Sequence, residues 1–302
     1  ASSYTSNSRQ LDDISWKHKD LLMFRSAGND NNNSTPDSIN TPATAKNIVT
    51  VGASESGFGY GSTSWSDVGS GTGDELNDVA EFSSHGPTKE GQMKPELIAP
   101  GGWYIWSADS DGDLSTNNTG ITYMGGTSMS CPTAAGFAAL IRQYFTDGYY
   151  PSGLPSAADS INPSGALIKA MLVNSTRNSP GRYSIDDLDH VGMQNAPSMG
   201  QGWGRITVND AAYFDGDTRD LLVYDERDGF TSAGESKEYQ FVTDASLDEY
   251  IKIVLVYTDY PASPAPASVV VNDLNLTVIA GANTYKGNVF GTEARSVTGV
   301  SY

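Results

Sequence analysis

The sequence predicts an α/β domain with a mainly parallel sheet, followed by an all-β module. Over the first 213 residues, short apolar segments alternate with helical segments, an alternation typical of parallel sheets. After Phe214, five short apolar segments are separated by turn residues, and no helical period appears. We therefore expect a first domain over residues 1–213 and a β-sandwich or jelly-roll domain over residues 214–302.

The individual elements follow from the apolar runs and from the residues that end them. In the first domain we expect strands at residues 21–26, 47–53, 79–83 and 96–99, and helices at 128–145 and 163–174. In the second domain we expect strands at 221–224, 236–242, 251–257, 269–271 and 274–279. The apolar strands of the second domain must bury a face, and we expect it to pack on the first domain.

Composition excludes several classes of partner. The chain has 36 acidic residues against 18 basic ones, so its net charge of −18 repels nucleic acid and anionic membranes. No apolar run reaches the length of a membrane span. Cys131 is the single cysteine, which rules out an intrachain disulfide, and we expect its side chain to be buried as a small hydrophobe.

The most informative segment is residues 125–140, with the sequence GGTSMSCPTAAGFAAL. Two glycines and a threonine precede Ser128, and small residues fill the helix that follows. A serine at a helix N-terminus lies among unpaired N–H groups at the positive end of the helix dipole, which suits an oxygen that becomes negative. Taken alone, Ser128 has a simpler interpretation as a helix N-cap.

The whole segment resembles the nucleophile motif of the subtilisin-like serine proteases, in which Gly-Thr-Ser-Met precedes a small residue and a nearby proline. The run FRSAGND at residues 24–30 is similar to the oxyanion segment of the same family. The resemblance implies that Ser128 is the nucleophile and that Asn29 donates a hydrogen bond to the oxyanion. It also implies that Ser26, Ala27 and Gly28 form one side of the substrate cleft and the P1 pocket.

The same resemblance covers nearly the whole chain and extends the expected fold. It implies a three-layer subtilisin-like first domain, while residues 257–259 and 271–276 resemble the C-terminal barrel of a group of large alkaline subtilases. The sequence stops at Tyr302, and we expect the barrel to be incomplete there. The chemistry implied requires no cofactor. A structural calcium ion is left open, with Asp259 and Asp273 as weak candidate ligands and its site unknown.

A serine nucleophile needs a general base and a carboxylate that orients the base. The three histidines, His18, His85 and His190, lie outside the family's histidine motif, and no aspartate lies in its aspartate motif. We expect both groups to lie N-terminal to Ala1. Three explanations remain open: a cleaved N-terminal fragment that stays bound, a chain identified only in part, and a degenerate relative.

The expected function is that of a secreted serine endopeptidase that acts on polypeptides. The alternative is a non-catalytic binding or structural protein derived from a subtilase. Five Asn-x-Ser/Thr sequons are candidate glycosylation sites, with chance occurrence as the alternative, and they lie at Asn32, Asn33, Asn117, Asn174 and Asn275.

Overall fold

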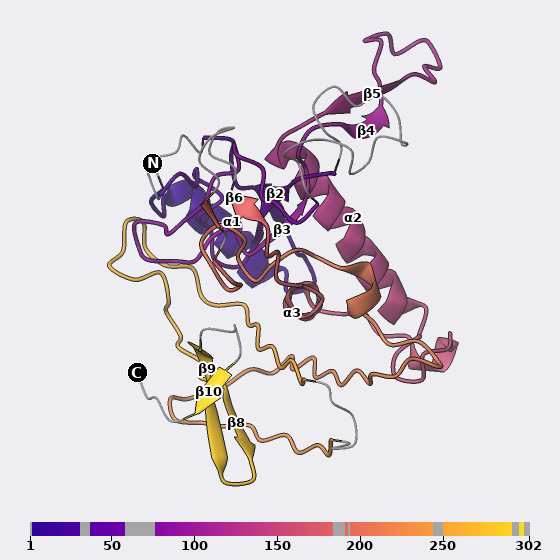
Figure 1. The fold of residues 1–302 in the computed structure, drawn as a ribbon. Helices are drawn as coiled ribbons and strands as arrows, with labels where there is room; N and C mark the ends of the chain where they lie inside the picture. Colours follow the sequence, from indigo (N-terminus) through magenta and orange to yellow (C-terminus); the bar gives the residue numbers. More distant parts are fainter. Residues whose placement is uncertain are drawn as a thin grey trace.

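The computed structural model describes residues 2–30, 37–57, 76–183, 191–192, 194–243, 250–291 and 296–298 (Figure 1). A three-stranded parallel sheet lies at the centre of the first domain, in the order β1-β2-β3. Its strands are β1 (Phe24–Ser26), β2 (Val49–Ser54) and β3 (Leu97–Pro100). The parallel sheet is confirmed, and its strands overlap three of the four predicted ranges.

Strand β2 forms the middle of this sheet because its sequence suits burial on both faces. All six of its residues, VTVGAS, are buried, as expected for a central parallel strand rich in β-branched side chains. Val51 pairs with Ser26 on one side and with Leu97 on the other. The fourth predicted strand, at residues 79–83, is reduced to one isolated bridge between Val79 and Ser54.

Two helices share one hydrophobic core with the sheet. Helix α2 (Thr127–Thr146) packs against all three strands and against α3 (Gly165–Asn174). Phe145 of α2 and Leu172 of α3 are fully buried in this core beside Val49 and Leu97. Pro132 lies in the second turn of α2, where its missing N–H leaves the carbonyl of Ser128 without the usual helical hydrogen bond. Both predicted helices are confirmed.

Helix α1 (Ser6–Lys17) precedes the sheet and was not predicted. It buries a polar face, formed by Ser8, Asp12 and Ser15, so the sequence carries no apolar helical period there. The hydroxyls of Ser8 and Thr44 are 2.7 Å apart, and Asn47 donates its backbone N–H to Asp12 over 2.8 Å. Hydrogen bonds rather than apolar contacts therefore position α1.

A buried ionic cluster lies under β2. Lys94 Nζ donates to Glu96 over 2.6 Å, and Lys169 Nζ from α3 reaches the same carboxylate over 3.0 Å. The second carboxylate oxygen of Glu96 accepts the backbone N–H of Thr50 over 2.7 Å. Burial would raise the pKa of Glu96, but the two lysines outweigh burial and hold that pKa below its usual value. The cluster ties β2, the start of β3 and α3 together.

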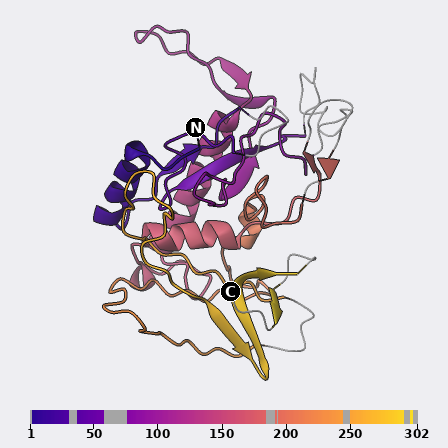
Figure 2. The ribbon, with the colours of Figure 1, turned by 90° about the vertical axis from the view of Figure 1, so that its left-hand side faces the viewer.

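A β-hairpin leaves the domain between the sheet and α2. Its strands are β4 (Ile105–Ala108) and β5 (Ile121–Met124), which pair antiparallel. The hairpin projects as an arm beyond the N-terminal end of α2 in both views (Figures 1 and 2). The described residues of the first domain also include short 3₁₀ helices at Ala157–Asp159 and Val208–Asp210 and a two-residue pair, β6 (Arg182–Tyr183) with β7 (Val191–Gly192).

The described residues of the C-terminal part include a three-stranded antiparallel sheet, in the order β10-β9-β8. Its strands are β8 (Thr277–Ala280), β9 (Asn283–Phe290) and β10 (Ser296–Thr298), and only β8 overlaps a predicted strand. In the described residues, the other four predicted ranges (221–224, 236–242, 251–257 and 269–271) contain no strand. Alternating apolar residues favour an extended chain, but a strand also needs a second strand with which its backbone forms hydrogen bonds. The β-sandwich or jelly-roll domain is not confirmed.

The C-terminal part lies beside α3 (Figure 2) and contacts both ends of that helix. At the N-terminus, Asp225 accepts the N–H of Ser164 over 2.8 Å and its hydroxyl over 2.6 Å. At the other end, Lys252 Nζ donates to the carbonyls of Val173 and Thr176, each over 2.8 Å. An acid at the N-terminus and a cation at the C-terminus both complement the helix dipole.

Candidate active site

Ser128 is exposed in the first turn of α2. The helix N-cap is Gly126, whose φ of 144° is a conformation that other residues rarely adopt. The carbonyl of Gly126 accepts the N–H of Met129 over 2.9 Å, and this bond closes the first turn around Ser128. The N–H of Ser130 donates to the same carbonyl over 3.4 Å, and the positive end of the α2 dipole lies at this turn, beside the Ser128 side chain.

Asn29 reaches this turn from the end of β1, about a hundred residues away in sequence. Thr127 donates to Asn29 Oδ1 twice, from its backbone N–H over 3.0 Å and from its hydroxyl over 2.7 Å. Because both donors require the oxygen, the amide nitrogen must point away from Thr127. Asn29 Nδ2 lies 3.2 Å from the point that a Cβ on Gly126 would occupy. The structure therefore places an N–H donor beside the turn that presents Ser128.

The residues predicted to line the cleft differ in their surroundings. Gly28 lies at this turn, since its N–H donates to Thr127 Oγ1 over 3.2 Å. Its φ is +116°, and a Cβ there would lie 2.9 Å from Ser84 Oγ, so the position favours glycine. Ala27 is fully buried beside Ile39 and Ala43. Ser26 is half-buried at the end of β1. The substrate-binding role of all three residues stays a prediction.

The nucleophile turn rests on the ends of β2 and β3. Gly101 accepts the N–H of Gly126 over 2.7 Å and donates its own N–H to Ser54 over 3.1 Å. A side chain at Gly101 would collide with Ser130 Oγ, which is buried beneath it. Pro100, Gly101 and Gly102 directly follow the strand that the sequence predicts at residues 96–99. The glycine pair after that strand was the available signal for close backbone contact.

Cys131 lies three residues after Ser128 in the same helix and is half-buried against the main hydrophobic core. Burial raises the pKa of its thiol, although the charge of Arg25 acts in the opposite direction. A raised pKa disfavours the thiolate, which is the reactive form of cysteine. Its position against the core agrees with the expected role as a small hydrophobe.

The histidines do not supply a base to Ser128 within the described residues. His18 ends α1, and His85 Nδ1 lies 3.0 Å from the carbonyl of Gly86. His190 lies outside the described residues. Among the residues that the structure describes, Ser128 Oγ forms no hydrogen bond to a side chain that could act as its base.

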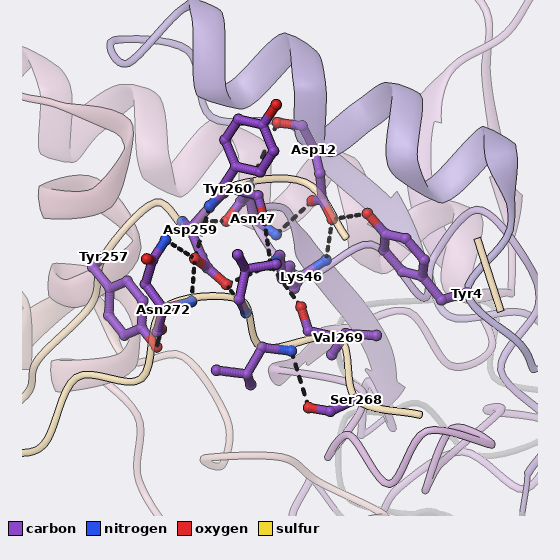
Figure 3. A network of polar contacts seen from close by, with 12 residues as sticks. Tyr4, Asp12, Lys46, Asn47, Tyr257, Asp259, Tyr260, Ser268, Val269 and Asn272 are labelled. Carbon is purple, nitrogen blue, oxygen red and sulfur yellow. Dashed lines mark hydrogen bonds and ion pairs between the residues drawn. The ribbon is translucent and has the colours of Figure 1, made fainter. Parts of the chain in front are cut away.

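The candidate calcium ligand Asp259 is buried in a polar network between the first domain and the C-terminal part (Figure 3). Its carboxylate forms an ion pair with Lys46 and accepts the N–H groups of Val271 over 2.8 Å and Asn272 over 3.0 Å. Protein donors thus occupy both carboxylate oxygens. Asp273, the other candidate, is exposed. In the described segments, no group of three or more His, Cys, Asp or Glu side chains is arranged to hold a metal ion.

The same network joins the two parts of the chain through a reciprocal pair of hydrogen bonds. Asn47 donates its side-chain amide to the carbonyl of Asp259 over 2.8 Å and accepts the N–H of Asp259 over 2.9 Å. Lys46 Nζ also donates to the carbonyls of Tyr260 and Val269, each over 2.6 Å. The expected packing of the C-terminal part on the first domain is thus seen, both in this polar network and in a buried apolar cluster of Tyr4, Ala262 and Val269.

Comparison with known proteins identifies the family. The model of the subtilase family, Peptidase_S8, matches residues 1–204, and the chain therefore belongs to the subtilase family. The serine protease/ABC transporter B family protein tagD of Dictyostelium discoideum is 25% identical, over 91% of this chain and 20% of that protein. The subtilisin-like protease SBT2.3 of Arabidopsis thaliana is 27% identical, over 87% of this chain and 29% of that protein.

Another protein and one solved structure are each similar to a part of this chain. The serine protease AprX of Bacillus subtilis is 36% identical over 38% of this chain and 25% of that protein. The crystal structure of fervidolysin from Fervidobacterium pennivorans, a keratinolytic enzyme related to subtilisin, covers 69% of this chain and 24% of its own. Its TM-score is 0.42 and its identity 22%. The chain thus spans less than a third of the length of each of these relatives.

Membership of the subtilase family supports serine protease function. In the described part of the chain, none of the helices has the length and apolar character that crossing a membrane requires.

Proposed function

We propose that this chain carries the nucleophile and the oxyanion-binding groups of a serine endopeptidase that acts on polypeptides. The observation that carries the proposal is the position of Asn29, which Thr127 holds beside the helix turn that exposes Ser128. An amide N–H donor next to a serine at the positive end of a helix is an arrangement that stabilises a developing oxyanion. An N-cap serine with a structural role would need no such donor.

In the proposed reaction, Ser128 Oγ attacks the carbonyl carbon of the scissile peptide bond and transfers its proton to a histidine. The carbonyl oxygen becomes an oxyanion that Asn29 Nδ2 and the N–H of Ser128 stabilise. The histidine then gives its proton to the leaving amine, which breaks the C–N bond and leaves an acyl ester on Ser128. Water hydrolyses the ester by the same steps and restores the serine.

We propose that the histidine and its aspartate come from a segment of the same protease outside these 302 residues, on its N-terminal side. In the described sheet, β1 is an edge strand that pairs only with β2. Nearby apolar side chains are exposed, including Leu21 at 43% and Leu140 of α2 at 57%. A further segment that pairs with β1 and covers these side chains would explain both features.

Labelling with a serine-directed phosphonate tests the proposal. We expect label on Ser128 in the assembled protease, together with a co-purifying fragment that contains the histidine and aspartate. The Ser128→Ala variant is the control, and it should neither label nor turn over a peptide. Absence of label from a folded assembly that contains both segments would overturn the proposal and favour a non-catalytic, subtilase-derived binding protein.

We further propose that the protein is secreted and that it is glycosylated at Asn117. We assign no residues to a structural calcium ion. Asn117 supports the proposed glycosylation because it is exposed in the loop between β4 and β5, whereas Asn174 Oδ1 is buried without a hydrogen bond among the described residues. Asn275 is also exposed. Asn32 and Asn33 lie outside the described residues. Mass spectrometry of peptides from the native protein should find glycan on Asn117 and none on Asn174.

A further inference from the structure

The hairpin of β4 and β5 leads directly into the candidate active site. Met124, the last residue of β5, precedes Ser128 by four residues, and only the turn of residues 125–127 lies between them. The hairpin strands are joined by residues 109–120, and the arm projects away from the core of the first domain (Figures 1 and 2). The arm therefore starts directly beside the turn that presents Ser128.

One face of the arm is aromatic. Trp106 and Tyr123 are directly opposite each other in the register, and their ring centroids are 5.1 Å apart. Tyr104 extends the same face, since its ring centroid lies 4.8 Å from that of Tyr123. Ile121 continues the face toward the tip because side chains two residues apart in a strand share one face. Ile121 is 70% exposed and Tyr123 is 49% exposed.

In the absence of a binding partner, the conformation of the arm is unfavourable in free energy. A two-stranded hairpin is marginally stable in water by itself, and exposed apolar side chains add to the cost. Tyr104 at its base has a φ of 65°, a left-handed conformation that is strained for a bulky residue. Strain and an exposed aromatic face next to a candidate nucleophile both indicate a binding element.

The tip of the arm is negatively charged. Residues 103–126 contain Asp109, Asp111 and Asp113 and neither lysine nor arginine. Hydrogen bonds from Thr116 and Ser115 hold the pKa values of Asp111 and Asp113 below the usual range, so both carboxylates stay ionised in mild acid. A cationic side chain is the complementary partner for such a tip.

We propose that the arm of β4 and β5 binds the polypeptide substrate at a distance from the scissile bond, with an apolar or aromatic side chain on the face of Trp106 and Tyr123 and a lysine or arginine at the aspartate tip. This inference rests on the proposed function of Ser128. The arm leads away from the start of α2 (Figure 1), so a substrate must extend several residues beyond the scissile bond to reach Ile121. Short peptides would miss most of the arm.

Peptide binding to the Ser128→Ala form of the assembled protease tests the arm without requiring turnover. We would compare, by calorimetry, a peptide of about 16 residues with one of about four residues that spans the scissile bond alone. The long peptide would carry aromatic and lysine side chains on both sides of the bond. We expect the long peptide to bind at least about tenfold more tightly, and the added Trp106→Ala and Tyr123→Ala changes to remove most of that advantage.

Ser107→Ala with Thr122→Ala is the matched control, because this pair lies opposite in the register on the other face of the hairpin. The control should keep the advantage of the long peptide. Thermal denaturation would establish that both variants are folded. Equal affinity of the aromatic variant and the control for the long peptide would then overturn the proposal.

A second variant keeps the test decisive if the aromatic variant does not fold. In Asp109→Asn with Asp111→Asn and Asp113→Asn, amide oxygens still accept the loop hydrogen bonds while the charge is lost. This variant should lose the preference for a lysine-containing long peptide over its alanine-substituted version, and an unchanged preference would count against the arm. If peptide binding depends on the arm but the protease with Ser128 intact does not turn the peptide over, only the proposed catalysis is refuted. If the protease turns the peptide over but binding does not depend on the arm, only the proposed role of the arm is refuted.

Discussion

Thr127 holds the side chain of Asn29 in one orientation, because its backbone N–H and its hydroxyl both donate to Asn29 Oδ1. The two residues lie in segments that are far apart in sequence, at the end of β1 and at the start of α2. The residue that precedes the candidate nucleophile therefore aims the candidate oxyanion donor. Nucleophile and donor move together if the turn at residues 125–127 shifts.

Replacing Thr127 by valine should misalign the Asn29 amide without removing it. We expect kcat of the assembled protease to fall about tenfold while KM changes less, because the lost hydrogen bond matters most when the oxyanion forms. Thr127→Ser keeps the hydroxyl and should restore most of the activity. Steady-state kinetics on one peptide compares the three proteins, and equal kcat in all of them would remove Thr127 from this role.

Asn29→Ala tests the donor itself. Removal of one oxyanion donor costs about 10²–10³-fold in kcat, and KM should change far less because the donor acts mainly in the transition state. Asn29→Asp removes the N–H donor and adds a negative charge, so its loss should be at least as large. A kcat within about twofold of the unchanged protein would show that Asn29 does not stabilise the oxyanion.

Lys46→Met should weaken the contact between the first domain and the C-terminal part. The amine lies in a buried ion pair with Asp259 and donates to two carbonyls, and breaking such a pair costs about 3–5 kcal/mol. We expect the midpoint of denaturant unfolding to fall. Lys17→Met is the control, because the ion pair of Lys17 with Asp13 is exposed on α1. Equal midpoints for the two variants would contradict the structure.

The Asp259 carboxylate should make the stability of the protein depend on pH in acid. Burial would raise its pKa, but Lys46, Val271 and Asn272 outweigh burial and hold the pKa below its usual value. The stability that the ionised form contributes is therefore present above about pH 4 and is lost as the pH falls through the lower, folded-state pKa.

Comparison with Asp259→Asn isolates this contribution. Burial raises the pKa of Asp12, which acts in the opposite direction, but Asp12 is present in both proteins and cancels in the difference. The unfolding free energy of the unchanged protein should exceed that of the variant at pH 6, and the gap should narrow below about pH 4. If this difference in unfolding free energy stays constant from about pH 6 to about pH 3, the charge of Asp259 does not contribute to stability.

Removal of the carboxylate from the buried ionic cluster should be strongly destabilising. Glu96→Leu would leave Lys94 and Lys169 as neighbouring buried cations, and burial already lowers the pKa of Lys94. We expect a loss of about 3–5 kcal/mol in unfolding free energy, and part of it should return at high pH as Lys94 loses its proton. Urea denaturation at pH 7 and pH 10 measures both effects.

The sequence predicts the parallel sheet and the helices α2 and α3 because their signals are local and strong. Residues 47–53 contain the β-branched run of a buried strand, and the small residues after Ser128 fit a tightly packed helix. The contact between Asn29 and Thr127 is not visible in the sequence, since it depends on how β1 and α2 pack. The roles of Ser128 and Asn29 remain predictions that the geometry supports.

Elements whose signals are polar or non-local escaped prediction. Helix α1 buries Ser8 and Asp12, so an apolar period is missing from its sequence. Strands β4 and β5 are separated by a 12-residue loop, which is longer than a hairpin turn that can be recognised from sequence. In the C-terminal part, alternation predicted strands at residues such as 251–257, but a strand also requires a paired neighbour there.

Because the amine of Lys46 is buried against the C-terminal part, tryptic cleavage after Lys46 can report on the separation of the two parts. A trypsin-type protease must take the lysine side chain into a pocket before it cleaves the following bond. In the docked state the side chain of Lys46 is only 9% exposed and is held by residues 259–269. Cleavage after Lys46 therefore requires the C-terminal part to leave and the backbone of Lys46 and Asn47 to be released from Asp12, so the rate of limited proteolysis at this bond would be a lower limit on how often the two parts separate.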